Sequence, residues 1–204
     1  MNKETFIAEI KKLGIEPTKE QMKKLENLYY IMIDYNKKVN LTRIVEKEEV
    51  YLKHYYDSLT LLKGIDLNNI HTLCDVGTGA GFPGLIIKIF FPKIKITLVD
   101  ALNKRIVYLN KVINDLELDS IEAIHSRAED IKQTYDVVVS RAVARIDKLL
   151  KMSFNLVKDK GCLIAMKANF EDEERYINKK YDYKMIKFLL PIEKSNRTIV
   201  IINK

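Results

Sequence analysis

The segment that decides the fold is "LCDVGTGAGFPGLIIKIFF", residues 73–91. It joins two apolar runs through a turn that holds four glycines within eight positions. Open α/β sheets bind ligands at such a turn, because glycine allows positive φ and leaves no Cβ in the path of a ligand. The segment therefore predicts a strand, a ligand-binding turn and a helix, with Pro83 in the first turn of that helix.

Acidic residues around this turn favour one class of cofactor. The spacing from Gly79 to Gly84 satisfies the G-x-G-x-x-G pattern of dinucleotide-binding proteins, which is a weak indication on its own. Asp100 ends the next apolar run, "ITLVD", where a carboxylate accepts hydrogen bonds from the ribose hydroxyls of NAD or of S-adenosylmethionine. Asp75 precedes the first glycine and suits the ammonium and sulfonium of S-adenosylmethionine better than an anionic pyrophosphate. The alternative role for Asp75 is an acid that braces the turn.

The chain divides into two parts at residue 66. Apolar residues recur at helical spacing within residues 1–66, which predicts an N-terminal helical subdomain. Thr18 and Gln21 have the pattern of a capping box, which predicts the start of the longest helix. The expected helices cover residues 6–13, 18–39 and 46–63.

The second part, residues 67–204, alternates β-rich runs with helical segments, as in a parallel sheet covered by helices. The last two β-rich runs, "YKMIKFLLPI" and "RTIVIINK", are separated by "EKSN" alone, so they form an antiparallel hairpin. The predicted fold is α/β and Rossmann-like, with a mostly parallel seven-stranded sheet and a C-terminal hairpin, as in class I S-adenosylmethionine-dependent methyltransferases. Its helices are expected over residues 83–91, 104–116, 147–157 and 171–179.

The composition is that of a globular protein with an excess of basic residues. The 204 residues carry a formal charge of +7, and residues 151–204 hold 12 basic and 7 acidic side chains. A basic face there suits a phosphate-bearing partner, although a lysine-rich chain reaches this charge without one. No apolar run has the roughly 18 residues of a membrane span, and the N-terminus does not resemble a signal peptide. Cys74 and Cys162 lack metal-ligand spacing, so we expect reduced thiols, no metal site and a cytoplasmic protein.

Two further segments are expected at the same edge of the sheet. "HSRAED" follows the third predicted strand, where the backbone of Ala128 and the carboxylate of Glu129 are placed to bracket an adenine. "VVVSRAVAR" follows the fourth predicted strand. Arg141 ends its apolar run, which is an expensive place for a charge unless the charge has a partner or a ligand.

Five motifs occur in a fixed order: "NLTRI" at residues 40–44, "HYYDSL" at 54–59, "DVGTGAGFPG" at 75–84, "SRAED" at 126–130 and "SRAVAR" at 140–145. This series resembles the glucose-inhibited division protein B family, the RsmG-type ribosomal RNA small-subunit methyltransferases. The resemblance covers nearly the whole chain. It implies methyl transfer from S-adenosylmethionine to guanine N7 in one nucleotide of 16S rRNA, and it places cofactor contacts on Gly77, Phe82, Ala128, Glu129 and Arg141.

The implied reaction needs little acid–base chemistry. Guanine N7 carries an exposed lone pair, so no general base is required and catalysis rests on alignment. His54 is as well explained by helix packing, and Arg43, Arg145 and Arg197 by solvated surface charge. The full expected cofactor set is Asp75, Gly77, Thr78, Gly79, Gly81, Phe82, Asp100, Ala128, Glu129 and Arg141. The expected RNA contacts are Arg43, His54, Arg141, Arg145, Lys167 and Arg197.

Other classes of function fit the sequence less well. A cytosine C5 methyltransferase needs a nucleophilic cysteine at the pocket, and Cys74 and Cys162 are misplaced for that role. An amino-group methyltransferase and a dehydrogenase fit less well than guanine N7 methylation. A non-catalytic ribosome-assembly factor that keeps the methyltransferase fold is the alternative from another class. The expected partner is 16S rRNA or the small ribosomal subunit, and the expected oligomeric state is a monomer.

Overall fold

The computed structural model describes residues 1–204 and confirms the predicted fold class. Seven strands form one sheet in the order β3-β2-β1-β4-β5-β7-β6. Strands β1 to β5 pair in parallel, and β7 runs antiparallel to both β5 and β6. The strands are β1 Thr72–Val76, β2 Lys95–Asp100, β3 Ile121–His125, β4 Tyr135–Arg141, β5 Val157–Lys167, β6 Tyr183–Leu189 and β7 Asn196–Asn203.

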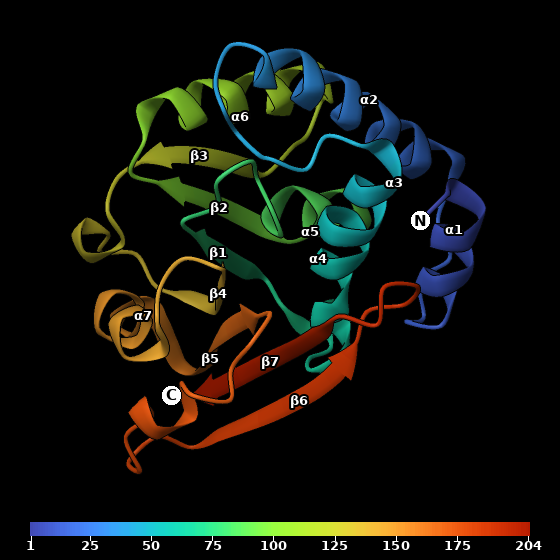
Figure 1. Cartoon of the computed structure of the whole chain (residues 1–204). Coiled ribbons are helices and arrows are strands. Elements are labelled where there is room, and N and C mark those ends of the chain that lie inside the picture. The colour runs from blue at the N-terminus through green and yellow to red at the C-terminus, as the bar shows by residue number, and fades with distance from the viewer.

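Helices cover the two faces of the sheet unequally (Figure 1). Helix α6 packs against β2 and β3, and α5 packs against β2. Helix α2 lies on the outer side of α5 and α6, α4 packs against α5, and α7 packs on the opposite face against β5. None of the helices is long and apolar enough to cross a membrane. The helices are α1 Lys3–Lys11, α2 Lys19–Asn36, α3 Lys47–Val50, α4 Asp57–Leu59, α5 Gly84–Phe90, α6 Asn103–Asp115 and α7 Ile146–Ser153.

One hydrophobic core joins the N-terminal helices to the sheet. Phe6 of α1 and Leu25 of α2 belong to the same buried cluster as Leu73 and Leu98 of the sheet. A second cluster, on the other face, packs α7 against residues such as Val138. Residues 1–66 therefore share a core with the sheet, and their division from residues 67–204 as a subdomain stays a prediction.

The N-terminal helices begin as the sequence predicts, but the third one is irregular. The Thr18 hydroxyl accepts from the Gln21 backbone N–H, and the Gln21 side chain accepts from the Thr18 N–H, so the capping box is present. The segment expected to form one helix over residues 46–63 is α3, a π-helical stretch Tyr51–Tyr56, α4 and a 3₁₀ turn. The wide π-helical turn contains His54 and leads directly into Asp57.

Two predicted helices differ from the structure. The charged helix expected over residues 171–179 is wrong, because only a 3₁₀ turn, Glu174–Tyr176, forms there. Its sequence has no apolar stripe that could hold a helix against the sheet. The helix expected over residues 147–157 ends at Ser153, and Val157 already belongs to β5.

Candidate active site

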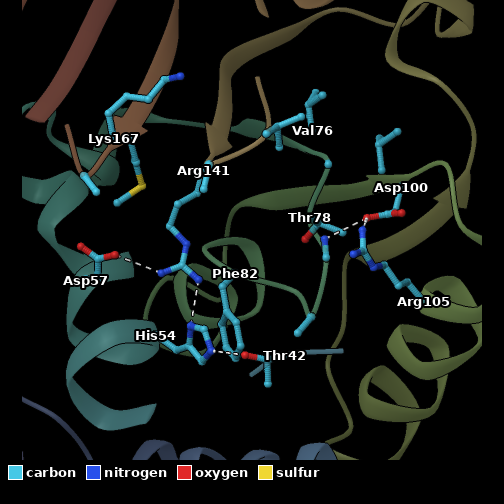
Figure 2. A pocket seen from close by; sticks show the side chains of 18 of the residues that line it. Thr42, His54, Asp57, Val76, Thr78, Phe82, Asp100, Arg105, Arg141 and Lys167 are labelled. Carbon is cyan, nitrogen blue, oxygen red and sulfur yellow. Dashed lines mark hydrogen bonds and ion pairs between the residues drawn. The ribbon is translucent and has the colours of Figure 1, made fainter. Parts of the chain in front are cut away.

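A cavity of about 880 Å³ opens at the carboxyl ends of β1, β2, β4 and β5. Its lining comes from every segment that the sequence singled out for ligand binding, together with the 40–44 loop and the π-helical stretch. Figure 2 shows Asp100 and Arg105 on one side, and His54, Asp57, Arg141 and Lys167 on the other. Six Lys or Arg side chains and three carboxylates line it, so its walls are net positive: Lys53, Arg105, Arg127, Arg141, Lys167 and Arg197 against Asp57, Asp100 and Glu129.

Asp75 shapes the glycine turn from below and does not reach the cavity. Its side chain is fully buried, and its Oδ2 accepts hydrogen bonds from the Thr78 hydroxyl at 2.7 Å and from the Gly84 N–H at 2.8 Å. Burial raises the pKa of Asp75 to about 6, against the lowering effect of these two hydrogen bonds. These contacts agree with the loop-bracing alternative, and a cofactor contact at Asp75 stays a prediction.

The glycines of the turn have different roles. Gly77, Gly79 and Gly81 all have positive φ. A Cβ on Gly79 would have no atom closer than 4.0 Å, so this position is open toward the cavity. A Cβ on Gly81 would lie 2.2 Å from Leu85 Cδ1, and Gly81 does not line the cavity. Gly81 thus allows close packing against α5, and its cofactor contact stays a prediction.

Asp100 lies at the end of β2, as the sequence predicts, and it anchors the turn. Its Oδ2 accepts from the Gly79 N–H at 3.0 Å and from Arg105 Nη1 at 2.9 Å, and its Oδ1 accepts from the Leu102 N–H at 2.9 Å. Sequence reasoning missed Arg105, although its position in the first turn of the helix after Asp100 was a usable signal. Ala128 and Glu129 line the same side of the cavity.

At the other side, one buried carboxylate binds two arginines. Asp57 accepts from Arg141 Nη1 at 3.0 Å through Oδ2 and from Arg197 Nε at 3.0 Å through Oδ1. Asp57 is 5% exposed. Arg141 also donates to the Lys53 carbonyl at 2.7 Å. Asp57 is thus the partner that the charge of Arg141 requires. The sequence analysis did not assign Asp57 to the site. An acid within the apolar run "YYDSLTLL" was nevertheless a sign that Asp57 has a buried partner.

His54 is a neutral acceptor for Arg141. Arg141 Nη2 and His54 Nδ1 are 3.0 Å apart, and arginine has no acceptor, so Nδ1 carries no proton. Nε2 then donates to the Thr42 hydroxyl at 3.0 Å. Burial and the positive charge of Arg141 lower the pKa of His54 to about 3. The ring stacks on Phe82 with centroids 4.5 Å apart. His54 therefore packs within the helical segment and also lines the cavity.

The remaining expected RNA contacts divide between the cavity and the surface. Lys167 and Arg197 line the cavity, but each is held by acids of the chain. Arg43 is exposed and lies outside the lining, beside Thr42 and Ile44, which do line it. Arg145 is exposed and forms two hydrogen bonds to Asp147, at 2.7 Å and 2.8 Å, so it is a paired surface charge.

Comparison with known proteins agrees with this geometry. The model of the family described as GidB, rRNA small subunit methyltransferase G, matches residues 21–198. The chain belongs to this family. Ribosomal RNA small subunit methyltransferase G of Bacillus subtilis is 43% identical, and the alignment covers all of this chain and 91% of the relative. The protein of the same name from Bacillus licheniformis is 44% identical with the same coverage.

Solved structures show the fold of this rRNA small subunit methyltransferase G family member. A SAM-dependent methyltransferase from Aquifex aeolicus has a TM-score of 0.58 at 18% identity, with 83% of this chain and 97% of that chain covered. TYW2 from M. jannaschii, in complex with AdoMet, has a TM-score of 0.52 at 20% identity, with 66% and 68% covered. Both carry the methyltransferase fold that the strand order indicates.

Proposed function

We propose that this chain transfers the methyl group of S-adenosylmethionine to N7 of a guanine in 16S rRNA. The observation that carries the proposal is one cavity with two chemically different sides, in a member of the rRNA small subunit methyltransferase G family. One side offers Asp100 and the open glycine turn, and the other offers the arginines bound by Asp57. These two sides suit a nucleoside cofactor and an anionic substrate.

The residues at the Asp100 side fit S-adenosylmethionine. The Asp100 carboxylate lines the cavity and, with two lone pairs on each oxygen, has acceptor capacity left for ribose hydroxyls. The space above Gly79 leaves room for a ligand against the backbone. Five further residues line the cavity, and we assign Ala128 and Glu129 to the base, Gly77 and Thr78 to the floor of the site, and Phe82 to an apolar wall. When bound, S-adenosylmethionine supplies an electrophilic methyl group on a positively charged sulfur.

The chain's own residues have to hold the base and exclude water. Guanine N7 has a lone pair and no proton, so none of the lining groups has to act as a base. Neutral His54 fits this, because its Nδ1 is occupied by Arg141 and its Nε2 by Thr42. The Arg141 guanidinium lies 5.7 Å from the centroid of the Phe82 ring, and the same ring stacks on His54, so these planar groups form a packed wall of the cavity. Rate enhancement then comes from the alignment of guanine N7 with the methyl carbon and the sulfur in the cavity.

The finer assignments follow from the same proposal. The substrate is rRNA of the small subunit, which places the reaction in the bacterial cytoplasm. The oligomeric state that we propose is a monomer. A non-catalytic assembly factor is not favoured, because its role would leave the open glycine turn and Asp100 without use.

Isothermal titration with S-adenosylhomocysteine, the reaction product, tests the cofactor assignment, with NADH as the comparator ligand. Gly79→Asp places a side chain in the open space of the turn, at a positive φ that aspartate tolerates. The matched control is Gly14→Asp, which also has positive φ and open space but lies in another part of the chain. We expect micromolar binding of S-adenosylhomocysteine to the wild type and to Gly14→Asp, and its loss in Gly79→Asp. Binding of NADH instead would contradict the proposal.

A further inference from the structure

A short connection between β4 and α7, residues 142–145, covers part of the glycine turn. A Cβ on Gly77 would lie 2.5 Å from Val143 Cγ2, so the Val143 side chain packs directly against the turn. Ala142 and Val143 both line the cavity. Ala142 has φ of +56°, a conformation that costs energy in a residue with a Cβ and persists only where neighbouring contacts hold it. We call residues 142–145 the cover segment.

Two side chains outside the cover segment hold it in place. Lys167 Nζ donates to the Ala144 carbonyl. The same ammonium donates to Glu173, 2.9 Å from Oε2 and 3.3 Å from Oε1. Glu173 Oε2 also accepts from the Ile146 N–H at 2.8 Å, directly after the cover segment. Lys167, at the end of β5, thus contacts the middle of the cover segment, and Glu173 joins Lys167 to Ile146, the first residue after the segment.

The burial of these groups makes the contacts strong. The Lys167 side chain is 9% exposed and that of Glu173 is 23% exposed. Charge-assisted hydrogen bonds away from water are stronger than neutral ones. A further contact joins the same segments, since the Arg145 guanidinium lies 3.9 Å from the centroid of the Tyr176 ring. Lys167 is therefore committed to partners within the chain, which argues against the phosphate contact expected from the sequence.

We propose that Glu173 is a positioning residue for the cofactor: through Lys167 and Ile146 it holds the cover segment against the glycine turn. The proposal rests on the proposed function, in which this turn binds S-adenosylmethionine. Glu173 does not line the cavity, so it acts only through the groups that it holds. Its role is distinct from RNA contact, because its carboxylate would repel phosphates.

Two substitutions of Glu173 separate the effect of its negative charge from the effect of its hydrogen bonds. Glu173→Ala removes every acceptor, whereas Glu173→Gln keeps one oxygen that can accept from both Ile146 and Lys167. The matched control is Glu174→Gln, the same change of charge at the next residue, whose carboxylate accepts from Tyr183 at 3.2 Å and does not contact Lys167. Titration with S-adenosylhomocysteine measures the cofactor site, and the KM for rRNA with its salt dependence measures the RNA contact.

We expect Glu173→Ala to weaken S-adenosylhomocysteine binding about ten-fold, the loss set by one charge-assisted hydrogen bond. Glu173→Gln should retain most of the affinity, and Glu174→Gln should bind as the wild type does. The KM for rRNA and its salt slope should not change. An altered RNA KM with unchanged S-adenosylhomocysteine affinity would overturn the proposal, because it would make Lys167 a phosphate contact that Glu173 regulates. Unchanged values for both would also overturn it.

Hydrogen exchange of the free protein gives a second readout that needs no ligand. In Glu173→Ala the Ile146 amide, which donates to Glu173 Oε2 in the wild type, should exchange about ten-fold faster. The Ala142 amide, which donates to the Met166 carbonyl, should also exchange faster, while the amides of β5 stay protected. A wild type that fails to bind S-adenosylhomocysteine would contradict the proposed function, and the exchange rates would still decide whether Glu173 holds the cover segment. Unchanged exchange in Glu173→Ala would refute the inference by itself.

Discussion

Asp57 is the single residue whose removal should disturb the site most. Its side chain is 7% exposed and accepts from Arg141 and Arg197, whose side chains are only 15% and 16% exposed. Asp57→Ala leaves two buried guanidinium groups without a counter-charge. Breaking a buried ion pair in this way costs roughly 3–5 kcal/mol. The arginines keep other acceptors, the carbonyls of Lys53 and Asn196, so the lower end applies.

The expected loss of about 3 kcal/mol in the free energy of unfolding is measured by urea denaturation of the free protein. For a chain of this length it corresponds to a fall of about 6–12 °C in the thermal midpoint. Arg197→Met added to Asp57→Ala should recover part of the loss, because it removes one of the two unpaired charges. Double-mutant analysis of these two changes measures the coupling directly.

The matched control is Asp147→Ala. Asp147 also binds an arginine through two hydrogen bonds, and these are shorter than those of Asp57, but its side chain is 34% exposed. Exposed ion pairs contribute little to stability. The reasoning predicts a much smaller effect at Asp147 than at Asp57. Equal effects, or a loss of less than about 1 kcal/mol at Asp57, would refute the argument that burial sets the cost.

Three other predictions follow from the fold and from the titration of buried groups. Gly84→Ala should lower the free energy of unfolding by about 1–3 kcal/mol in urea denaturation, because a Cβ there would lie 2.2 Å from Leu98 Cδ2. Lys88→Met should cost about 2 kcal/mol in urea denaturation, because its buried ammonium donates to the carbonyls of Pro92 and Ile94. The pKa of His54, lowered to about 3 in the folded state by burial and by Arg141, predicts that the wild type loses stability relative to His54→Gln as the pH falls from about 6.5 toward 3. A pH-independent difference between these two proteins would contradict the neutral state of His54.

The sheet and the glycine turn could be predicted because their signals are local. The apolar runs, the glycine spacing and the short connection before β7 each require one local structure, and together they predict the mostly parallel sheet with a C-terminal hairpin that the structure has. The capping box of α2 is likewise contained within four residues. The prediction of a helix over residues 171–179 was wrong because it rested on charged residues that favour helix formation. The segment has no apolar face to bury against the sheet.

The site itself could be predicted only in part, because its decisive pairings are long-range. Asp57 and Arg197 are 140 residues apart, and the sequence around either residue does not indicate that it pairs with the other. Glu173 is one of four consecutive acids, so the sequence could not single it out as the partner of Lys167. For Asp75 the sequence left two roles open, and its hydrogen bonds to Thr78 and Gly84, which favour loop bracing, could not be read from the sequence.

The central claim is that a guanine of 16S rRNA receives a methyl group on N7. The most direct test supplies the purified chain with radiolabelled S-adenosylmethionine and small subunits, or 16S rRNA, from cells that lack this family's enzyme. Borohydride reduction followed by aniline cleaves RNA at N7-methylguanosine, so the product is located by the cleavage. The account predicts about one methyl group per 16S rRNA, cleavage at one guanosine, and loss of both with Gly79→Asp. Label in the RNA without cleavage at a guanosine, or no label on either substrate, would contradict it.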